Sequence, residues 1–270
     1  MKRKISTFFV YLFLSISAFL SIFPFYWMIV GSTNTSVDVI KGKLIFGTHL
    51  LENLNKLFKE YDLWRVLLNS VQVSVFVVIG SLIVASMAGY GFEIYKSKVR
   101  NKIYGIFIWT LMIPFAALMV PLFRLMNVFN LIDSLWGIIL PMIPSVFLIF
   151  FFKQNFQQYP KEIIMAARVD GASELRIFFS IVVPSMKATY AAAAIYAFMT
   201  SWNAYLWPLV IIQSSEKRTM TLFVSNLASG YKPDFALVMT AVVLATLPMI
   251  IVFFALQKYF VQGVLGSVKQ

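Results

Sequence analysis

The chain has 270 residues, of which 60% are hydrophobic and only 13% are charged, and its formal net charge is +12. A soluble globular protein of this length needs a larger charged surface, so the composition excludes that class and indicates a membrane protein. The sequence has no cysteine, which excludes disulfides and thiolate metal sites.

Six apolar segments of 19 to 25 residues follow one another along the chain, and none contains Asp, Glu, Lys or Arg. About 20 apolar helical residues cross the hydrocarbon core of a bilayer, and uninterrupted runs exclude the alternating strands of a membrane barrel. We predict an all-α polytopic membrane protein with a single transmembrane domain over residues 1–270. Its six predicted transmembrane helices are residues 8–30, 69–92, 103–123, 134–152, 188–212 and 235–256.

The first segment follows three basic residues, Lys2, Arg3 and Lys4, as in a secretory signal peptide. Its apolar run is longer than the about 7 to 15 residues of such a peptide, so we expect an uncleaved first helix.

Basic residues set the expected orientation. With the N-terminus inside, 14 of the 23 Lys and Arg residues lie in inner segments and the other 9 in outer ones. Because cytoplasmic loops keep the excess of basic residues, we expect both termini in the cytoplasm. The basic residues are spread over several short loops, which argues against nucleic-acid binding.

The cytoplasmic connection of residues 153–187 has a pattern that predicts two short helices. Pro160 suits the start of the first helix, and Gly171 suits the left-handed conformation that ends it. Ser173 suits the cap of the second helix, with Glu174 in its first turn. The first helix has about ten residues, too few to be stable alone in water, so it must pack against another surface.

One face of that first helix is expected to dock on another protein. Glu162, Met165, Ala166 and Val169 share this face by their spacing. The alternative is an amphipathic helix that lies on the lipid surface, although lipid binding does not require a tight turn between two helices.

Aromatic residues and an amide gather in the fifth predicted span. Sugars present apolar ring faces and hydroxyl edges, so Tyr196, Trp202 and Asn203 are candidates to line a sugar path. Packing is an equally good explanation for Trp202 and Asn203, and Trp207 is expected to lie at the membrane interface. A stripe of small residues predicts close packing against a partner subunit, namely Thr189, Ala193, Ala197 and Ser201.

Several motifs resemble the membrane subunits of binding-protein-dependent sugar importers of the maltose and multiple-sugar permease type. The most specific is Ala-Ala-Arg-Val-Asp-Gly-Ala-Ser over residues 166–173, followed by Ile-Val-Val-Pro over residues 181–184, which is similar to the EAA loop of that family. Further similar stretches lie at residues 69–70, 88–92, 119–123, 202–209 and 257–263, so the resemblance covers roughly residues 5–270.

The resemblance implies a permease subunit of an ATP-binding-cassette importer in the bacterial cell membrane, which translocates a sugar or oligosaccharide into the cytoplasm. It implies a second related permease, two ATPase subunits and an extracytoplasmic sugar-binding protein as partners. It assigns docking on the ATPase, centred on Gly171, to the loop residues Glu162, Met165, Ala166, Ala167, Asp170, Gly171 and Ala172. It also implies that residues 213–234 reach into the binding protein and that the C-terminal tail contacts the ATPases.

The sequence contains no G-x-x-x-x-G-K-[ST] phosphate-binding loop. We therefore expect ATP and Mg²⁺ to be bound by a partner ATPase, and we expect this chain to be a transport subunit without cofactor, metal or catalytic residues.

Two other functional classes fit the sequence less well. An ion-coupled secondary transporter would place ionisable residues near the midplane, where the predicted spans have none. A membrane hydrolase would need a nucleophile with a base or a metal set, whereas the single histidine is His49 and neither H-E-x-x-H nor G-x-S-x-G occurs.

Met165 stands where the EAA loop usually has a glutamate, and two explanations stay open. Met165 fills an apolar ATPase cleft, or Glu162 on the same face supplies the missing charge.

Overall fold

The computed structural model describes the backbone of residues 2–266 and the side chains of residues 7–258. This part of the chain is helical and contains no strand. It forms two compact units, one up to residue 63 together with residues 223–248, the other of residues 64–222 together with those from residue 249 onward. The side chains of Lys2, Arg3 and Lys4 are therefore not described. In the tail expected to contact the ATPases, residues 259–266 are described in their backbone alone, and residues 267–270 lie outside the described residues.

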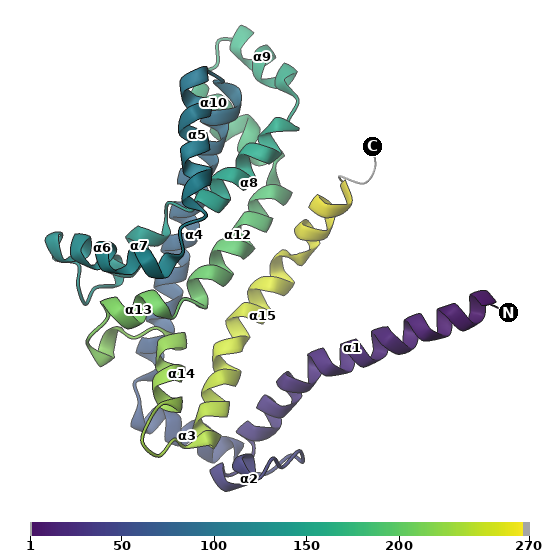
Figure 1. The fold of residues 1–270 in the computed structure, drawn as a ribbon, viewed down its shortest axis with the longest axis vertical. Helices are drawn as coiled ribbons and strands as arrows, with labels where there is room; N and C mark the ends of the chain where they lie inside the picture. The colour runs from purple at the N-terminus through teal and green to yellow at the C-terminus, as the bar shows by residue number, and fades with distance from the viewer. Residues whose placement is uncertain (1, 267–270) are drawn as a thin grey trace. The chain divides into compact units, whose positions relative to one another are not determined.

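The first unit consists of three N-terminal helices and parts of two later ones (Figure 1). The helices are α1 (Lys2–Ser32), α2 (Ser36–Ile40) and α3 (Leu50–Glu60), with contributions from α14 (Met220–Ala228) and α15 (Phe235–Gly266). The end of α1 lies close to α15, because a Cβ added at Gly31 would be 2.9 Å from the Cγ of Met239. The apolar side chains of α1 from Phe8 to Phe25 are exposed in this chain, as expected for a helix that faces lipid or another subunit.

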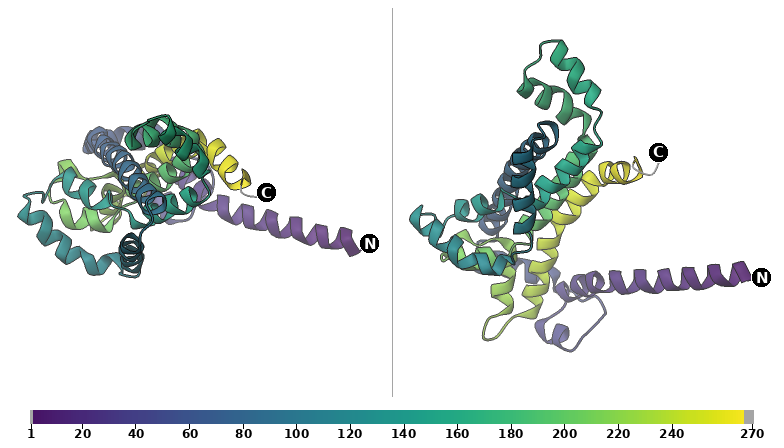
Figure 2. Two further views of the ribbon diagram at one scale, coloured as in Figure 1. Left: turned by 90° about the horizontal axis from the view of Figure 1, so that it is seen from above. Right: turned by 45° about the horizontal axis from the view of Figure 1, so that its top comes forward.

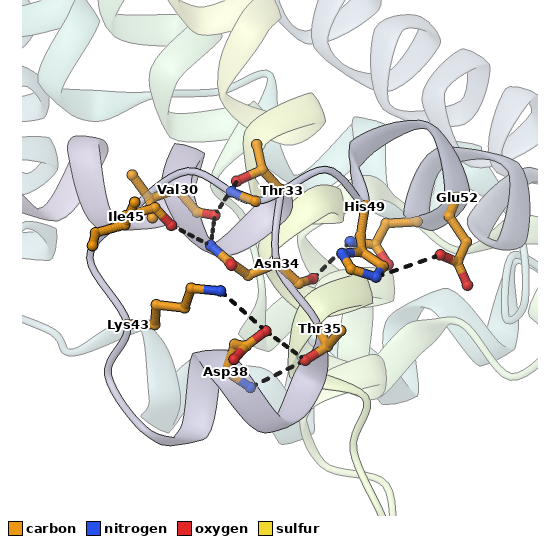
Figure 3. Close-up of polar contacts among 11 residues, drawn as sticks. Val30, Thr33, Asn34, Thr35, Asp38, Lys43, Ile45, His49 and Glu52 are labelled. Carbon is orange, nitrogen blue, oxygen red and sulfur yellow. Dashed lines mark hydrogen bonds and ion pairs between the residues drawn. The ribbon is translucent and has the colours of Figure 1, made fainter.

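Buried amides hold the segment that follows α1 (Figure 3). The Asn34 side chain donates to the carbonyls of Val30 and Ile45, at 2.9 Å each. Asn53 of α3 donates to the carbonyls of Ser32 and Asn34, at 2.9 and 3.0 Å. These bonds give buried carbonyls the donors that they need, and they fix the loop between α1 and α3.

The start of α15 is capped within the same unit. The Asp234 carboxylate accepts from the N–H groups of Ala236 and Leu237 and pairs with Lys56 at 2.8 Å. The Ser36 hydroxyl accepts from the N–H of Phe235 at 2.9 Å. Acidic and hydroxyl acceptors are what the free N–H groups of a helix start require.

The second unit contains the long helix α4 and a series of shorter helices (Figure 1). In chain order these are α4 (Leu63–Ile94), α5 (Lys98–Thr110), α6 (Phe115–Val128), α7 (Leu135–Met142), α8 (Val146–Gln157), α9 (Lys161–Val169), α10 (Glu174–Ile177), a π-helical turn (Phe178–Val182), α11 (Val183–Ser185), α12 (Lys187–Trp202), α13 (Leu206–Ile211) and a 3₁₀ turn (Ser215–Lys217). Its core packs α8, α9, the π turn and α12 around Phe152 and Phe156.

Three of the six predicted spans are not continuous helices. The span of residues 134–152 is divided between α7 and α8, with Pro144 in the break. The span of residues 103–123 is broken between α5 and α6, which meet at 105°. Pro114 stands at this break, where its missing N–H interrupts the helix and its ring disfavours a helical residue before it. The span of residues 188–212 ends at Trp202, and a separate helix, α13, starts at Leu206. Pro208 in α13 has no N–H to donate four residues back, so α12 does not continue through it.

Within the described residues, four helical segments are long and apolar enough to cross a membrane, and counting two bent pairs as spans raises the number to six. The four are residues 7–32, 63–94, 135–157 and 235–258, and the bent pairs are α5 with α6 and residues 174–185 with α12. The predicted all-helical membrane fold is confirmed. The predicted number of six membrane spans is reached only if each bent pair is counted as one span.

Candidate docking loop and transport path

The loop that connects α8 and α12 forms a helical hairpin of α9 and α10 (Figure 2). Gly171, at φ +77°, turns the chain after α9. The N–H of Gly171 donates to the carbonyl of Arg168, and the N–H of Ala172 donates to the carbonyl of Ala167, both at 3.0 Å. This pair of bonds is the Schellman arrangement of a helix end. The Ser173 hydroxyl then accepts from the N–H of Arg176 and caps α10. The predicted start, turn and cap are all confirmed.

The two faces of α9 have opposite environments. Ile164 and Ala167 are buried in the core of the unit, at 2% and 7% exposure. Glu162, Met165, Ala166 and Val169 lie on the exposed face, with Met165 53% and Val169 87% exposed. Of the seven predicted docking residues, Asp170 and Gly171 are also exposed, whereas Ala167 faces the core and Ala172 packs partly against it.

Arg168 joins the two helices of the hairpin. Its guanidinium makes two hydrogen bonds to the Glu174 carboxylate, at 2.7 and 3.2 Å, and lies 5.7 Å from the ring centroid of Tyr95. A bidentate pair of this kind fixes orientation as well as distance. The hairpin is therefore held both by its turn and by a side-chain pair.

Sequence reasoning missed a carboxylate at the base of α9. Glu93, in the last turn of α4, is fully buried, and three ammonium groups surround it. Lys96 and Lys161 lie 2.7 and 3.3 Å from its Oε1, and Lys153 lies 3.6 Å from its Oε2. We call these four residues the Glu93 cluster. Only Lys96, three residues away on the chain, carried a local signal, since the other two lysines come from α8 and α9.

A second missed carboxylate, Asp133, lies between α6 and α7. It accepts from the N–H groups of Gln213 and Ser214 at 3.0 and 2.9 Å, from the Ser214 hydroxyl at 2.9 Å and from Lys217 at 3.2 Å. The two backbone N–H groups hold the pKa of Asp133 well below its usual range, against the opposing effect of burial. We call these four residues the Asp133 site.

The Glu93 cluster and the Asp133 site belong to opposite ends of α4. Near the start of α4, Asn69 donates to the carbonyls of Glu216 and Arg218, which adjoin the Asp133 site. Asn69 and Glu93 are 24 residues apart in one helix, about 36 Å at ~1.5 Å per residue. That separation exceeds the ~30 Å hydrocarbon core of a bilayer.

Of the three residues predicted for the sugar path, Asn203 lines a cavity of ≈ 370 Å³. Tyr196, Thr200 and Asn203 are exposed and share one face at the end of α12, with Thr200 also lining the cavity. Trp202 is 3% exposed and stacks on Phe198 at 5.4 Å, so it packs inside the unit. The remaining lining residues are Phe115, Met142, Ala204, Tyr205, Leu206 and Trp207.

Trp207 is a packing residue rather than the predicted interfacial aromatic. It is 2% exposed, and its indole N–H donates to the carbonyl of Gly137 at 3.0 Å. This bond satisfies a buried donor and joins α13 to α7.

Comparison with known proteins gives a family and a fold. The sequence profile of the family described as "Binding-protein-dependent transport system inner membrane component" matches residues 78–266. The lactose transport system permease protein LacG of Rhizobium radiobacter is 49% identical over 269 residues, which cover 100% of this chain and 98% of that protein. The arabinooligosaccharides transport system permease protein AraQ of Halalkalibacterium halodurans is 36% identical over the full length of both.

A further relative and a solved structure belong to systems that transport other compounds. The sn-glycerol-3-phosphate transport system permease protein UgpE of Escherichia coli is 31% identical over 92% of each chain. The crystal structure of a bacterial ABC transporter involved in the import of the acidic polysaccharide alginate has a chain with the same fold, with a TM-score of 0.87, 22% identity and coverage of 96% of this chain and 98% of the other.

Proposed function

Because this chain belongs to the family of binding-protein-dependent transport system inner membrane components, we propose that it translocates a sugar or oligosaccharide across the bacterial cell membrane at the expense of ATP hydrolysed by a partner. Membership makes it a multi-pass membrane protein and a transport subunit, and it implies partner components such as an ATPase and a binding protein. We further propose a second related permease and two ATPase subunits, as the resemblance implies.

The observation that supports ATPase docking best is the exposed face of α9. A nine-residue helix is too short to be stable alone, yet this one is fixed by its buried face, its Schellman turn and the Arg168–Glu174 pair. Glu162, Met165 and Ala166 are thereby presented outward on a rigid element, as a docking surface requires. We propose that this face, with Asp170 and Gly171, contacts the ATPase.

A neutral sugar fits the cavity beside Asn203 better than a phosphorylated one. The residues that line it are apolar, aromatic, amide or hydroxyl, and none is charged. Aromatic faces and neutral hydrogen-bonding groups suit sugar rings, whereas a phosphate calls for Arg, Lys or free N–H groups. We propose that Tyr196, Thr200 and Asn203 form this chain's part of the sugar path.

We propose that both termini and the hairpin of α9 and α10 are cytoplasmic, and that the Asp133 site is on the outer side. The Lys and Arg distribution supports this orientation. Reporters fused after Asn101 and Glu174 should then report cytoplasm, and those after Asn55 and Ser229 the outside. Labelling of residue 174 by an impermeant reagent in intact cells would contradict this orientation.

Uptake in cells deleted for this chain's gene tests the function. Labelled lactose, an arabino-oligosaccharide and glycerol 3-phosphate should be compared with and without the complementing gene. We expect restored uptake of a neutral sugar that survives a protonophore and stops when ATP is depleted. Uptake driven by an ion gradient, or restored for glycerol 3-phosphate alone, would contradict the proposal.

A further inference from the structure

Three elements of the second unit meet at one buried carboxylate. Glu93 belongs to α4, Lys153 to α8 and Lys161 is the first residue of α9, while Lys96 follows the end of α4. The Glu93 side chain is 0% exposed, Lys153 is 14% exposed, and the side chains of Lys96 and Lys161 are about half exposed. The Glu93 cluster is thus a junction between two membrane helices and the exposed hairpin.

The charges of the cluster make Glu93 indispensable to its geometry. Three ammonium groups share one carboxylate, and two of them, Lys96 and Lys161, lie against the same oxygen. Without the carboxylate these like charges would repel one another and separate, although solvent weakens the repulsion between the half-exposed Lys96 and Lys161. A buried ion pair is weak evidence for stability, but it does fix which groups lie together.

Lys161 is the first residue of α9, directly after the N-cap Pro160. At the far end the helix is fixed by the Gly171 turn and the Arg168–Glu174 pair. At the near end Lys161 links it to α4 through the 3.3 Å contact with Glu93, in addition to the apolar core that Ile164 shares with Tyr90 of α4. The neighbouring residue, Glu162, already belongs to the exposed face.

Lys153 extends the junction to α5. Its ammonium lies over the Tyr104 ring at 4.6 Å from the centroid, and 3.6 Å from the Glu93 Oε2, an oxygen with no hydrogen-bond partner in the part of the chain that the structure describes. Lys153 is therefore shared between a cation–π contact and an ion pair. A small shift of the ammonium toward either partner would strengthen one contact at the expense of the other.

From this convergence we propose that Glu93 is the positioning residue that ties the docking helix α9 to the membrane helices α4 and α8, so that movement of α9 is transmitted to both. The inference rests on the proposed docking of the ATPase on α9. It adds a residue that touches neither the ATPase nor the sugar but determines how tightly ATP hydrolysis is linked to transport.

The first experiment measures the position of α9 directly. Because the chain has no cysteine, spin labels can be attached at Val99→Cys in α5 and Ile163→Cys in α9, both at exposed positions. The chain is purified in its assembled complex and the distance distribution between the labels is recorded. We expect Glu93→Gln and Lys161→Met to broaden it and Glu93→Asp to broaden it less. Lys98→Met, which removes an exposed ammonium two residues after Lys96, should leave it unchanged. An unchanged distribution in both Glu93→Gln and Lys161→Met would overturn the proposal.

The second experiment measures ATP hydrolysed per sugar transported by the same complexes in proteoliposomes. We expect this ratio to rise about 5-fold or more in Glu93→Gln and in Lys161→Met, as for a lost coupling between two sites. The double variant should be no worse than either single one, because the two residues act through one contact. An unchanged ratio, or additive effects in the double variant, would overturn the proposal. If Glu93→Gln does not assemble, Lys161→Met tests the same contact.

Recovery of the ATPase with the tagged permease separates this inference from the proposed function. It should be normal in Glu93→Gln, because the exposed face of α9 is intact. If recovery were also normal in every variant of that face, ATPase docking on α9 would be wrong, while the distance measurement would still report on Glu93.

Discussion

The carboxylates found near the two ends of α4 have different kinds of partner. At the Asp133 site two of the donors are backbone N–H groups, which cannot move without the loop that carries them. In the Glu93 cluster all three partners are ammonium groups on long flexible stems. The backbone donors favour one fixed geometry at the Asp133 site. The lysine side chains of the Glu93 cluster can instead move with the Glu93 carboxylate when it shifts by a small distance. We infer that the Asp133 end of the unit is the more rigid one, and that adjustable contacts lie beside α9.

The largest effect is expected from Gly171→Val, which tests whether sugar uptake depends on the orientation of α9, the helix beside the Glu93 cluster. A left-handed backbone costs a residue with a side chain roughly 1–2 kcal/mol, and more when it is β-branched. Among the described residues, apart from Gly171 and its two chain neighbours, no atom lies within 4 Å of a Cβ added there, so the effect should come from the backbone alone. Sugar uptake should fall about 10-fold while the amount of inserted permease is unchanged. Gly171→Asn, which tolerates this conformation, should retain most uptake, and wild-type uptake by Gly171→Val would refute a role for the turn.

Asp133→Ala should lower stability without changing the ATP cost of transport. It leaves two N–H groups and the Ser214 hydroxyl without their acceptor, at about 1–3 kcal/mol for buried groups and less in proportion to solvent access. Thermal unfolding of the detergent-purified chain, followed by tryptophan fluorescence, measures the loss, and Asp133→Asn should lose less. If Asp133→Ala instead raised the ATP hydrolysed per sugar, the contrast with Glu93 would be wrong.

Met165→Ala compared with Glu162→Ala decides which residue of the exposed face replaces the usual glutamate. We favour Met165 as an apolar contact, because a half-exposed thioether that becomes buried on docking should contribute about 1–2 kcal/mol. ATPase recovery with each variant is measured at low and high salt. Loss with Met165→Ala at both salt concentrations supports the apolar contact. Salt-sensitive loss with Glu162→Ala alone would support the charged one.

The stabilisation by Asp133 should depend on pH in a defined direction. Its pKa is lowered in the folded chain, so the contribution is complete above the ordinary carboxyl pKa of about 3.9 and is lost as the pH falls toward the folded value. The difference in melting temperature between wild type and Asp133→Asn should therefore shrink between pH 6 and pH 3. A difference that stayed constant over this range would mean that the charge of Asp133 contributes nothing.

The smallest effect is expected for Glu174→Gln. The Arg168–Glu174 pair is 38% and 43% exposed, and exposed pairs contribute about 0–1 kcal/mol. A change in melting temperature that disappears at high salt would fit this estimate, with Lys98→Met as a control. A large, salt-independent loss would make the pair, rather than the Gly171 turn, the main constraint on the hairpin.

Local patterns predicted local structure well. The start of α9, the left-handed Gly171 and the Ser173 cap depend on a few adjacent residues, and all three are confirmed. The apolar runs predicted the membrane helices, but the prolines within and beside them were not weighed, so the breaks at Pro114, at Pro144 and before Pro208 were missed.

Contacts between distant segments could not be predicted in the same way. The small residues Ala193, Ala197 and Ser201 were expected to face a partner subunit, yet they are buried within this chain. Glu93 simply marked the end of an apolar run, because its partners Lys153 and Lys161 lie 60 and 68 residues away. Spacing along one helix shows that residues share a face, but it does not say which neighbour covers that face.

The π-helical turn at Phe178–Val182 affects how insertions and deletions would act on this loop. Pro184 has no N–H to donate four residues back, and the chain takes a wider turn just before it. Such a turn holds one residue more than an α-helical turn. Deleting one residue there could restore a regular helix, but it would rotate everything on one side by about 100° relative to the other. The exposed face of α9 would then point in a different direction, although all of its side chains would be unchanged. The number of residues in the π-helical turn therefore matters to the docking surface as much as the residues on that surface do.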